Sequence, residues 1–371
     1  MRIVIFSHSL VSDWNHGNAH FLRGFSTELV LRGHQVDIFE PADGWSRTNL
    51  IQQHGPEALQ EFARIYPHIT SRLYDLESLD LSRALSGADL VIVHEWNPVE
   101  LVAAIGRHRA IHGGYRLFFH DTHHRSVTKP EEMESYDLRH YDGVLAYGSI
   151  IRDLYLKSGW TSSAWTWHEA ADTRVFRPRS LSSYEGDLVW IGNWGDGERS
   201  KELREFLIEP VRALKLKARI YGVRYSGAVL EEFAAAGIEY GGWLPNYRVP
   251  DVFGRYRVTV HVPRGPYADA LPGIPTIRPF EALACGIPLI SAPWSDSEGL
   301  FRPGRDFLTA GDGREMISSL RNVFSDSGLA KSLTASGLET IHARHTCGHR
   351  VDELLGIVQG MPEFALTQGT I

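Results

Sequence analysis

Cysteine is scarce in this chain of 371 residues, which holds only Cys285 and Cys347. Two thiols exclude a disulfide-stabilised scaffold and are typical of a protein from a reducing compartment. Long apolar runs are also lacking. The run at residues 1–6 is too short for a signal peptide, and no stretch approaches the roughly 20 apolar residues of a membrane span. We therefore expect a cytoplasmic protein with no transmembrane segment.

A surplus of positive charge is also lacking, because 38 Lys and Arg residues face 45 Asp and Glu residues, for a net charge of −7. General nucleic-acid binders need basic residues to neutralise phosphates, so we expect no such binding. The hydrophobic content of 43% and the charged content of 22% are those of a globular protein. A chain of this length exceeds what one ordinary core fills, which predicts two domains.

Strand and helix patterns alternate along both halves of the chain. A strand at residues 2–6, a helix at 18–32 and a strand at 34–39 form a βαβ unit, which predicts a parallel sheet. Residues 62–85 are more polar and are interpreted as helix and crossover. Further strands are expected at 89–93, 116–119, 143–146, 164–168, 187–192, 218–221, 258–262 and 287–291, and further helices at 98–108, 201–214, 229–236, 316–324 and 347–360.

The composition changes after His168, and residues 171–186 have the pattern of an interdomain linker. We expect an N-terminal domain at 1–170, a C-terminal domain at 171–345 and a final segment at 346–371. Each domain should be a doubly wound, Rossmann-like α/β unit. Because open α/β sheets bind ligands at the carboxyl ends of their strands, the loops that follow the strands should form two walls of one cleft.

The segment at residues 276–292 predicts a short helix that begins at a ligand and leads into a buried strand. Thr276 can cap the helix and Gly286 can end it. Arg278 and Glu281 lie near its positive end, which can bind phosphate, and a carboxylate one turn in can accept both hydroxyls of a ribose. In the alternative interpretation, Glu281 only complements the helix dipole and Arg278 only solvates the surface.

Two more segments of the C-terminal half follow predicted strands. The glycine-rich loop at 192–200 lets backbone approach a diphosphate, and Arg199 adds a cation, although a plain flexible turn is the alternative. Residues 240–246 can form a slot for a nucleobase, or Trp243 can plug an interdomain surface. The candidate donor-binding residues are Asn193, Trp194, Arg199, Tyr221, Trp243, Leu244, Arg278 and Glu281.

In the N-terminal half, His120 and Asp121 follow the strand at 116–119, where Asp121 can orient the imidazole for acid–base chemistry. The alternative is that these side chains form hydrogen bonds to the interdomain linker. The adjacent imidazoles of the next residues are poorly spaced to bind one zinc ion. The loop after the first strand offers His16 as a second base, and Asn18 either caps the next helix or binds sugar hydroxyls. The catalytic candidates are His16, His120 and Asp121, and the acceptor or sugar candidates are Asp13, Asn18, His94, Tyr267 and Asp269.

The segment at 276–292 resembles the sugar-nucleotide motif of GT-B glycosyltransferases. In the retaining branch two glutamates lie eight positions apart; Glu281 corresponds to the second, and Gly273 stands in place of the first. With this departure, residues 184–355 resemble the CgeB-like glycosyltransferases, and the matching motifs lie at 187–193, 241–245, 299–301 and 345–350. The resemblance implies the GT-B fold, a donor site in the C-terminal domain, an acceptor site in the N-terminal domain, and a final segment that packs back on the N-terminal domain.

The resemblance also implies the activity, a hexosyltransferase-type transfer of sugar from a nucleoside diphosphate sugar such as a UDP-sugar to an unidentified acceptor. No cofactor or metal is expected, because a helix end and cations stabilise the leaving diphosphate and no Asp-x-Asp element follows a strand. Gly273 favours inversion, with a base among Asp13, His16, His120 and Asp121. The alternatives are a sugar-nucleotide epimerase and a non-catalytic binding protein of sugar nucleotides or glycans.

Overall fold

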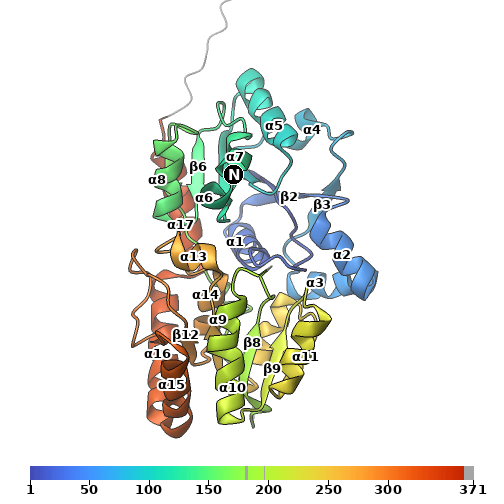
Figure 1. The fold of residues 1–371 in the computed structure, drawn as a ribbon. Coiled ribbons are helices and arrows are strands. Elements are labelled where there is room, and N and C mark those ends of the chain that lie inside the picture. Colours follow the sequence, from blue (N-terminus) through green and yellow to red (C-terminus); the bar gives the residue numbers. More distant parts are fainter. Residues whose placement is uncertain (180–182, 196, 363–371) are drawn as a thin grey trace, which may run out of the picture.

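The computed structural model describes residues 1–179, 183–195 and 197–362, and within them the chain forms two parallel sheets flanked by helices (Figure 1). The strand orders are β3-β2-β1-β4-β5-β6-β7 and β10-β9-β8-β11-β12-β13. The expected α/β architecture of two doubly wound domains is confirmed. Residues 180–182 of the predicted linker, residue 196 of the glycine-rich loop and residues 363–371 of the final segment lie outside the described residues.

The N-terminal sheet is built on β1, whose residues Ile3, Val4 and Ile5 are buried because helices cover both faces of a parallel sheet. Its strands are β1 (Arg2–Phe6), β2 (Gln35–Pro41), β3 (Ser71–Tyr74), β4 (Leu90–His94), β5 (Arg116–Asp121), β6 (Gly143–Ala146) and β7 (Ala164–Thr166). Its helices are α1 (Ala19–Leu31), α2 (Trp45–His54), η1 (Pro56–Leu59), α3 (Gln60–Ile65), α4 (Leu81–Leu85), α5 (Val99–His112), α6 (Arg125–Thr128), α7 (Pro130–Glu134) and α8 (Ser149–Lys157).

The C-terminal sheet is likewise parallel throughout, with β8 and β11 paired at its centre. Its strands are β8 (Gly186–Ile191), β9 (Ala218–Tyr221), β10 (Ile238–Tyr240), β11 (Tyr256–His261), β12 (Leu289–Ser291) and β13 (Leu308–Thr309). Its helical elements are α9 (Ser200–Leu203), η2 (Arg204–Ile208), α10 (Glu209–Leu214), α11 (Gly227–Ala235), η3 (Asn246–Arg248), α12 (Val249–Phe253), α13 (Gly265–Asp269), α14 (Ile277–Cys285), α15 (Gly313–Ser325) and α16 (Ser327–Arg344).

The helix of the 276–292 segment, α14, differs from the prediction at its start. Thr276 occupies the N-cap position with φ 62° and ψ 176°, and its side chain makes no cap hydrogen bond, so the predicted cap is wrong. This backbone region is one that residues other than glycine rarely adopt and is costly. At the other end Gly286 adopts the left-handed conformation and ends the helix, as predicted.

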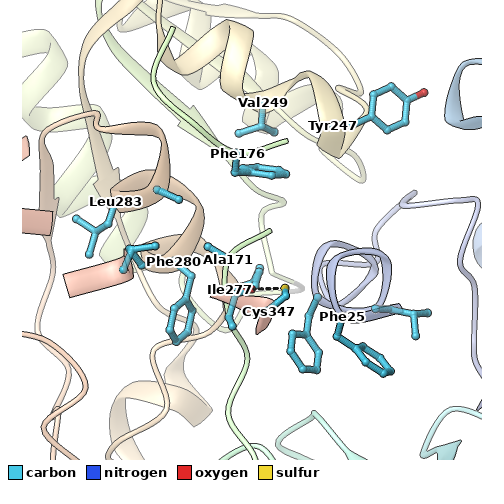
Figure 2. Packing of buried hydrophobic residues seen from close by; sticks show 14 of the residues in the cluster. Phe25, Ala171, Phe176, Tyr247, Val249, Ile277, Phe280, Leu283 and Cys347 are labelled. Carbon is cyan, nitrogen blue, oxygen red and sulfur yellow. Dashed lines mark hydrogen bonds between the residues drawn. The ribbon is translucent and has the colours of Figure 1, made fainter. Parts of the chain in front are cut away.

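The last helix, α17 (Cys347–Gln359), packs against α1, and Figure 1 shows it in red beside elements of the N-terminal half. A capping box formed by Thr346 and His349 starts it. Figure 2 shows Cys347 and Phe25 in the same buried cluster as Phe280 of α14. One hydrophobic core therefore runs from α1 through the domain boundary to α14.

Candidate functional site

A cavity of about 810 Å³ lies between the two sheets, and loops that follow strands of both domains line it. The N-terminal wall comes from the segments after β1, β2, β4, β5, β6 and β7, and the C-terminal wall from those after β8, β9, β10 and β11 together with the start of α14. This is where parallel α/β sheets place ligands, and the volume falls in the range of small-molecule sites. Of the predicted site residues, those lining it are Asp13, His16, Asn18, Asn193, Arg199, Trp243, Leu244, Tyr267 and Arg278.

Two of the predicted bases, Asp13 and His16, line the cavity; Asp13 is paired with the buried Arg23, which leaves His16 as the stronger candidate of the two. Its Nε2 lies 3.1 Å from the Ser9 carbonyl oxygen, which only accepts, so Nε2 carries the proton and Nδ1 carries the lone pair. Burial, with the charges of His8 and Arg23, lowers the pKa of His16 well below its ordinary value. The imidazole is therefore neutral at pH 7 and is suited to accept a hydrogen bond.

The predicted pair of His120 and Asp121 does not form, and neither side chain lines the cavity. Consecutive residues of a strand point to opposite faces of the sheet. His120 packs on Trp167, with ring centroids 4.9 Å apart, and burial lowers the pKa of His120 to about 3. On the other face, Asp121 accepts a hydrogen bond from the Tyr155 hydroxyl at 2.9 Å. Asp121 therefore does not orient His120.

Four other predicted residues also lie away from the cavity. His94 is buried, with its Nε2 3.0 Å from Thr122 Oγ1. Trp194 packs against Phe233 with ring centroids 5.7 Å apart, the Tyr221 hydroxyl lies 3.4 Å from Nη1 of Arg219, and Asp269 is an exposed residue at the end of α13. Sequence places a residue after a strand, but it does not fix the direction of its side chain.

Arg199 is the central cation of the C-terminal wall. Its Nη1 donates to the Val262 carbonyl at 2.8 Å, its Nη2 donates to the Asn193 carbonyl at 2.7 Å, and its guanidinium lies over the ring of Trp190. Its Nε is buried without a hydrogen-bond partner, and no carboxylate of the described residues lies within ion-pair distance. Burial lowers the pKa of Arg199 to about 10. Among the described residues, this cation therefore has no counter-ion.

Glu281 is fully buried behind the cavity wall and does not line it. Its Oε1 accepts from Asn246 Nδ2 at 2.6 Å and lies 3.2 Å from His20 Nδ1, and its Oε2 pairs with Arg278. Burial raises the pKa of Glu281, but Arg278, His20 and Asn246 outweigh it and hold the pKa below the ordinary value. A ribose would have to replace one of these partners, whereas Arg278 itself faces the cavity.

Gly273, the position of the absent first glutamate, has φ +90°. A Cβ at this position would lie 2.6 Å from Cγ of Glu298, a distance that real Cβ atoms essentially never show. The carboxylate of Glu298 accepts from the Ser149 backbone N–H and from His168 Nε2, both at 2.8 Å. Backbone conformation and this bridge between domains therefore account for the glycine, with no need to invoke lost chemistry.

Asn18 and Glu169 form a polar contact that the sequence analysis missed. Asn18 precedes α1 but makes no cap hydrogen bond; its Nδ2 instead donates to Glu169 Oε1 at 3.0 Å. Glu169 is buried, lines the cavity and follows β7. Its position after a predicted strand was the available signal. Other cavity residues that were missed include His8, Trp45, Trp96, His123, His124, Arg125, His261 and Arg264.

Glu169→Gln is expected to raise the free energy of unfolding at pH 8 relative to the wild type. Burial, with the charge of Glu281, raises the pKa of Glu169 from its ordinary 4.5 to about 7, so the folded state binds the proton more tightly than the unfolded state does. The contribution of Glu169 to the free energy of unfolding is fully present below pH 4.5 and is lost as the pH rises through 7. This loss is at most about 3 kcal/mol. Urea unfolding between pH 5 and 8 measures it. A difference between the two proteins that stays constant with pH would contradict the prediction.

Two further features concern only the part of the chain that the structure describes. No helix in it combines the length and hydrophobicity that are needed to cross a membrane. No group of three or more His, Cys, Asp or Glu side chains in it is arranged to hold a metal ion.

Comparisons with known proteins agree with this architecture. Residues 199–356 match the family described as glycosyl transferase-like. No curated protein matches the chain. Among solved structures, sucrose-phosphate synthase from Thermosynechococcus elongatus is 14% identical with a TM-score of 0.64, over 96% of this chain and 98% of that one. A glycosyltransferase from Rickettsia africae is 12% identical with a TM-score of 0.66, over 96% and 97%.

A third similar structure is that of HepE from Anabaena in complex with UDP-glucose. It is 12% identical with a TM-score of 0.66 and covers 97% of this chain and 100% of that chain. At such low identity, the likenesses to these three structures establish the fold. The chain therefore has the two-domain GT-B fold of glycosyltransferases, with a glycosyl transferase-like sequence over residues 199–356.

Proposed function

We propose that the protein is a glycosyltransferase that moves a hexose from a UDP-sugar to an acceptor held by the N-terminal domain. The observation that carries the proposal is the cavity between the domains, which is lined by Arg199, by Arg278 and by the start of α14. Similar structures were solved in complex with UDP and UDP-glucose, which supports UDP as the nucleotide. The sequence motifs and Gly273 support placement among the CgeB-like enzymes, and the two free buried cysteines accord with a cytoplasmic protein.

The donor diphosphate is assigned to Arg199, Arg278 and the start of α14. A helix N-terminus carries free N–H groups and partial positive charge, and a cation without a counter-ion gains most from a bound anion. Trp243 and Leu244 line the same wall and supply the slot for the base. Glu281 remains the candidate ribose ligand, because the Asn246 amide that now occupies its Oε1 is a neutral partner that a ribose hydroxyl can replace.

The acceptor is assigned to the N-terminal wall. Trp45 and Trp96 line it with 46% and 40% of their surface exposed, and aromatic faces of this kind pack against the C–H faces of sugars. The neutral His16 presents Nδ1 as a hydrogen-bond acceptor for an acceptor hydroxyl. Cations and the helix end stabilise the leaving diphosphate, so the reaction needs no divalent metal.

UDP and UDP-glucose are expected to stabilise the protein more than ADP, GDP or their sugars. A ligand that binds only the folded state adds about 2.7 kcal/mol at a hundredfold excess over its dissociation constant. A thermal-shift series followed by calorimetry measures this. Preference for another nucleotide corrects the donor assignment, and no response to any nucleotide contradicts the proposed function. Radiolabelled donor with and without an acceptor extract then separates transfer from epimerisation and from binding alone.

Transfer is expected to continue at full rate in excess chelator. The positive charge that stabilises the leaving diphosphate comes from Arg199, Arg278 and the α14 N-terminus, none of which EDTA removes. The measurement is UDP release from UDP-glucose with EDTA, compared with the same assay in Mg²⁺. Loss of activity in EDTA with recovery on addition of Mg²⁺ would contradict the prediction.

A further inference from the structure

We infer that Glu169 is the general base that takes the proton from the acceptor hydroxyl, an inference that rests on the proposed function. Glu169 lies between the starts of two helices that face the cavity from opposite domains. Asn18 directly precedes α1, and Thr276 directly precedes α14, and both line the cavity with Glu169. A smaller crevice is lined by Glu169 together with Thr276 and Tyr147. The carboxylate is thus placed where acceptor and donor meet.

The backbone on either side of Glu169 is firmly held. His168 is tied to Glu298, which also accepts from the backbone N–H at the start of α8. Arg350 of α17 donates its Nε to the carbonyl of Glu169 itself at 3.4 Å. After Glu169, the Ala171 backbone N–H donates to the His345 carbonyl at 2.8 Å. A reactive carboxylate needs such a fixed position, because small displacements of a reacting group cost rate.

The carboxylate of Glu169 has one hydrogen bond, from Asn18 to Oε1, and no ion pair within the described parts of the chain. The other groups near it in the described parts of the chain include Tyr147 after β6, Tyr267 on α13, the buried carboxylate of Glu281 and His168, whose imidazole is paired with Glu298. None of these groups forms an ion pair with Glu169. Its oxygen Oε2 is therefore available for a proton.

The protonation behaviour of Glu169 matches this role better than that of His16. Burial raises the pKa of Glu169 to about 7, whereas burial lowers the pKa of His16 well below its ordinary value. A base works best when its pKa lies near the working pH, because it must be free at the start of the step and able to keep the proton afterwards. His16 disfavours its charged form and serves as a hydrogen-bond acceptor.

The reaction step balances with these groups alone. The oxygen of the acceptor hydroxyl forms a bond to the anomeric carbon, and its proton moves to Oε2 of Glu169. The bond from the anomeric carbon to the diphosphate oxygen breaks, and its electron pair leaves with UDP, where the cations of the C-terminal wall receive the charge. Glu169 then releases the proton to water. Water can take the place of the acceptor, which gives slow hydrolysis of the donor.

The test measures UDP release from UDP-glucose, with water as the acceptor, for the wild type, Glu169→Gln and Glu169→Asp from pH 5 to 9. Glutamine keeps an oxygen for Asn18 but cannot take a proton. We expect kcat/KM of the wild type to rise with a midpoint near pH 7. In Glu169→Gln we expect kcat to fall roughly 10²- to 10⁴-fold, with no such midpoint and with UDP affinity nearly unchanged. Partial recovery of rate and midpoint is expected for Glu169→Asp.

The matched control is Glu185→Gln, because Glu185 is an exposed carboxylate paired with Arg255 outside the cavity. It should behave as the wild type. A Glu169→Gln protein with wild-type kcat, with an unchanged pH midpoint, or with only a loss of UDP affinity overturns the inference. So does a wild type that binds UDP-glucose but never hydrolyses it. Failure of the wild type to bind any nucleotide is a separate result, which overturns the proposed function first.

Discussion

Arg199→Met is expected to weaken UDP binding by about 2–4 kcal/mol, which is roughly a 30- to 1,000-fold rise in dissociation constant. The guanidinium faces the cavity with a buried Nε that lacks a hydrogen-bond partner and with no carboxylate in ion-pair distance among the described residues. A diphosphate supplies the missing counter-charge, so the loss of the guanidinium should weaken UDP binding, in addition to the loss of its hydrogen bonds to the Val262 and Asn193 carbonyls. Methionine keeps apolar contact with Trp190, and calorimetry with UDP measures the change.

Arg204→Met is the matched control for this experiment. Arg204 also lies over a tryptophan, with its guanidinium 5.4 Å from the ring centroid of Trp194, but it is paired with Glu232 on the surface. The Arg204→Met protein should bind UDP with the same affinity as the wild type. If Arg199→Met binds UDP as tightly as Arg204→Met does, the diphosphate does not contact Arg199 and the donor assignment is wrong.

Asp13→Ala is expected to lower the free energy of unfolding by about 3–5 kcal/mol, because it leaves a buried cation unpaired. Arg23 is completely buried, and its Nη1 donates to Asp13 Oδ2 at 2.9 Å. Asp13 also joins the two domains, since it accepts from Trp243 Nε1 at 3.2 Å and from the Asn246 backbone N–H at 3.0 Å. Urea unfolding at pH 7 measures the loss.

A comparison with Asp251→Ala controls for the loss of an acidic residue. Asp251 pairs with Arg179 and Arg248 near the surface, where such pairs contribute about 0–1 kcal/mol. Asp13→Asn should fall between the two, because the amide oxygen keeps one acceptor while the charge is lost. Equal destabilisation by Asp13→Ala and Asp251→Ala would show that the buried ion pair does not anchor the interface.

The interior of the fold was predictable because its strands are continuous apolar runs. Residues such as Ile3 to Phe6 are buried on both faces, so the pattern is unambiguous. Of the four edge strands only β7 was predicted; β3 and β10 are largely exposed and β13 has only two residues, so their patterns are weak. Helix α16 was missed for a different reason: its buried face includes Gly337 and Thr340, and Gly337 is needed where Leu283 of α14 approaches closely.

The candidate site was predictable to the level of loops, but not of side chains. The strand pattern placed His16 and Arg199 in one cleft, because both follow strands of parallel sheets. It also predicts His120 and Asp121 there, but β5 continues through Asp121 and turns the two side chains to opposite faces of the sheet. Glu169 acquires its character only from tertiary burial and from Asn18, which no local pattern reveals.

The packing of α17 on α1 has a consequence for how the chain is made. On the ribosome, α1 is synthesised well before α17, the helix that covers it, because the two are far apart in the sequence. At usual elongation rates of about 5–20 residues per second, tens of seconds separate the two. During that time Phe25 and its neighbours lack their final cover, which makes nascent chains stalled before residue 347 natural clients for chaperones.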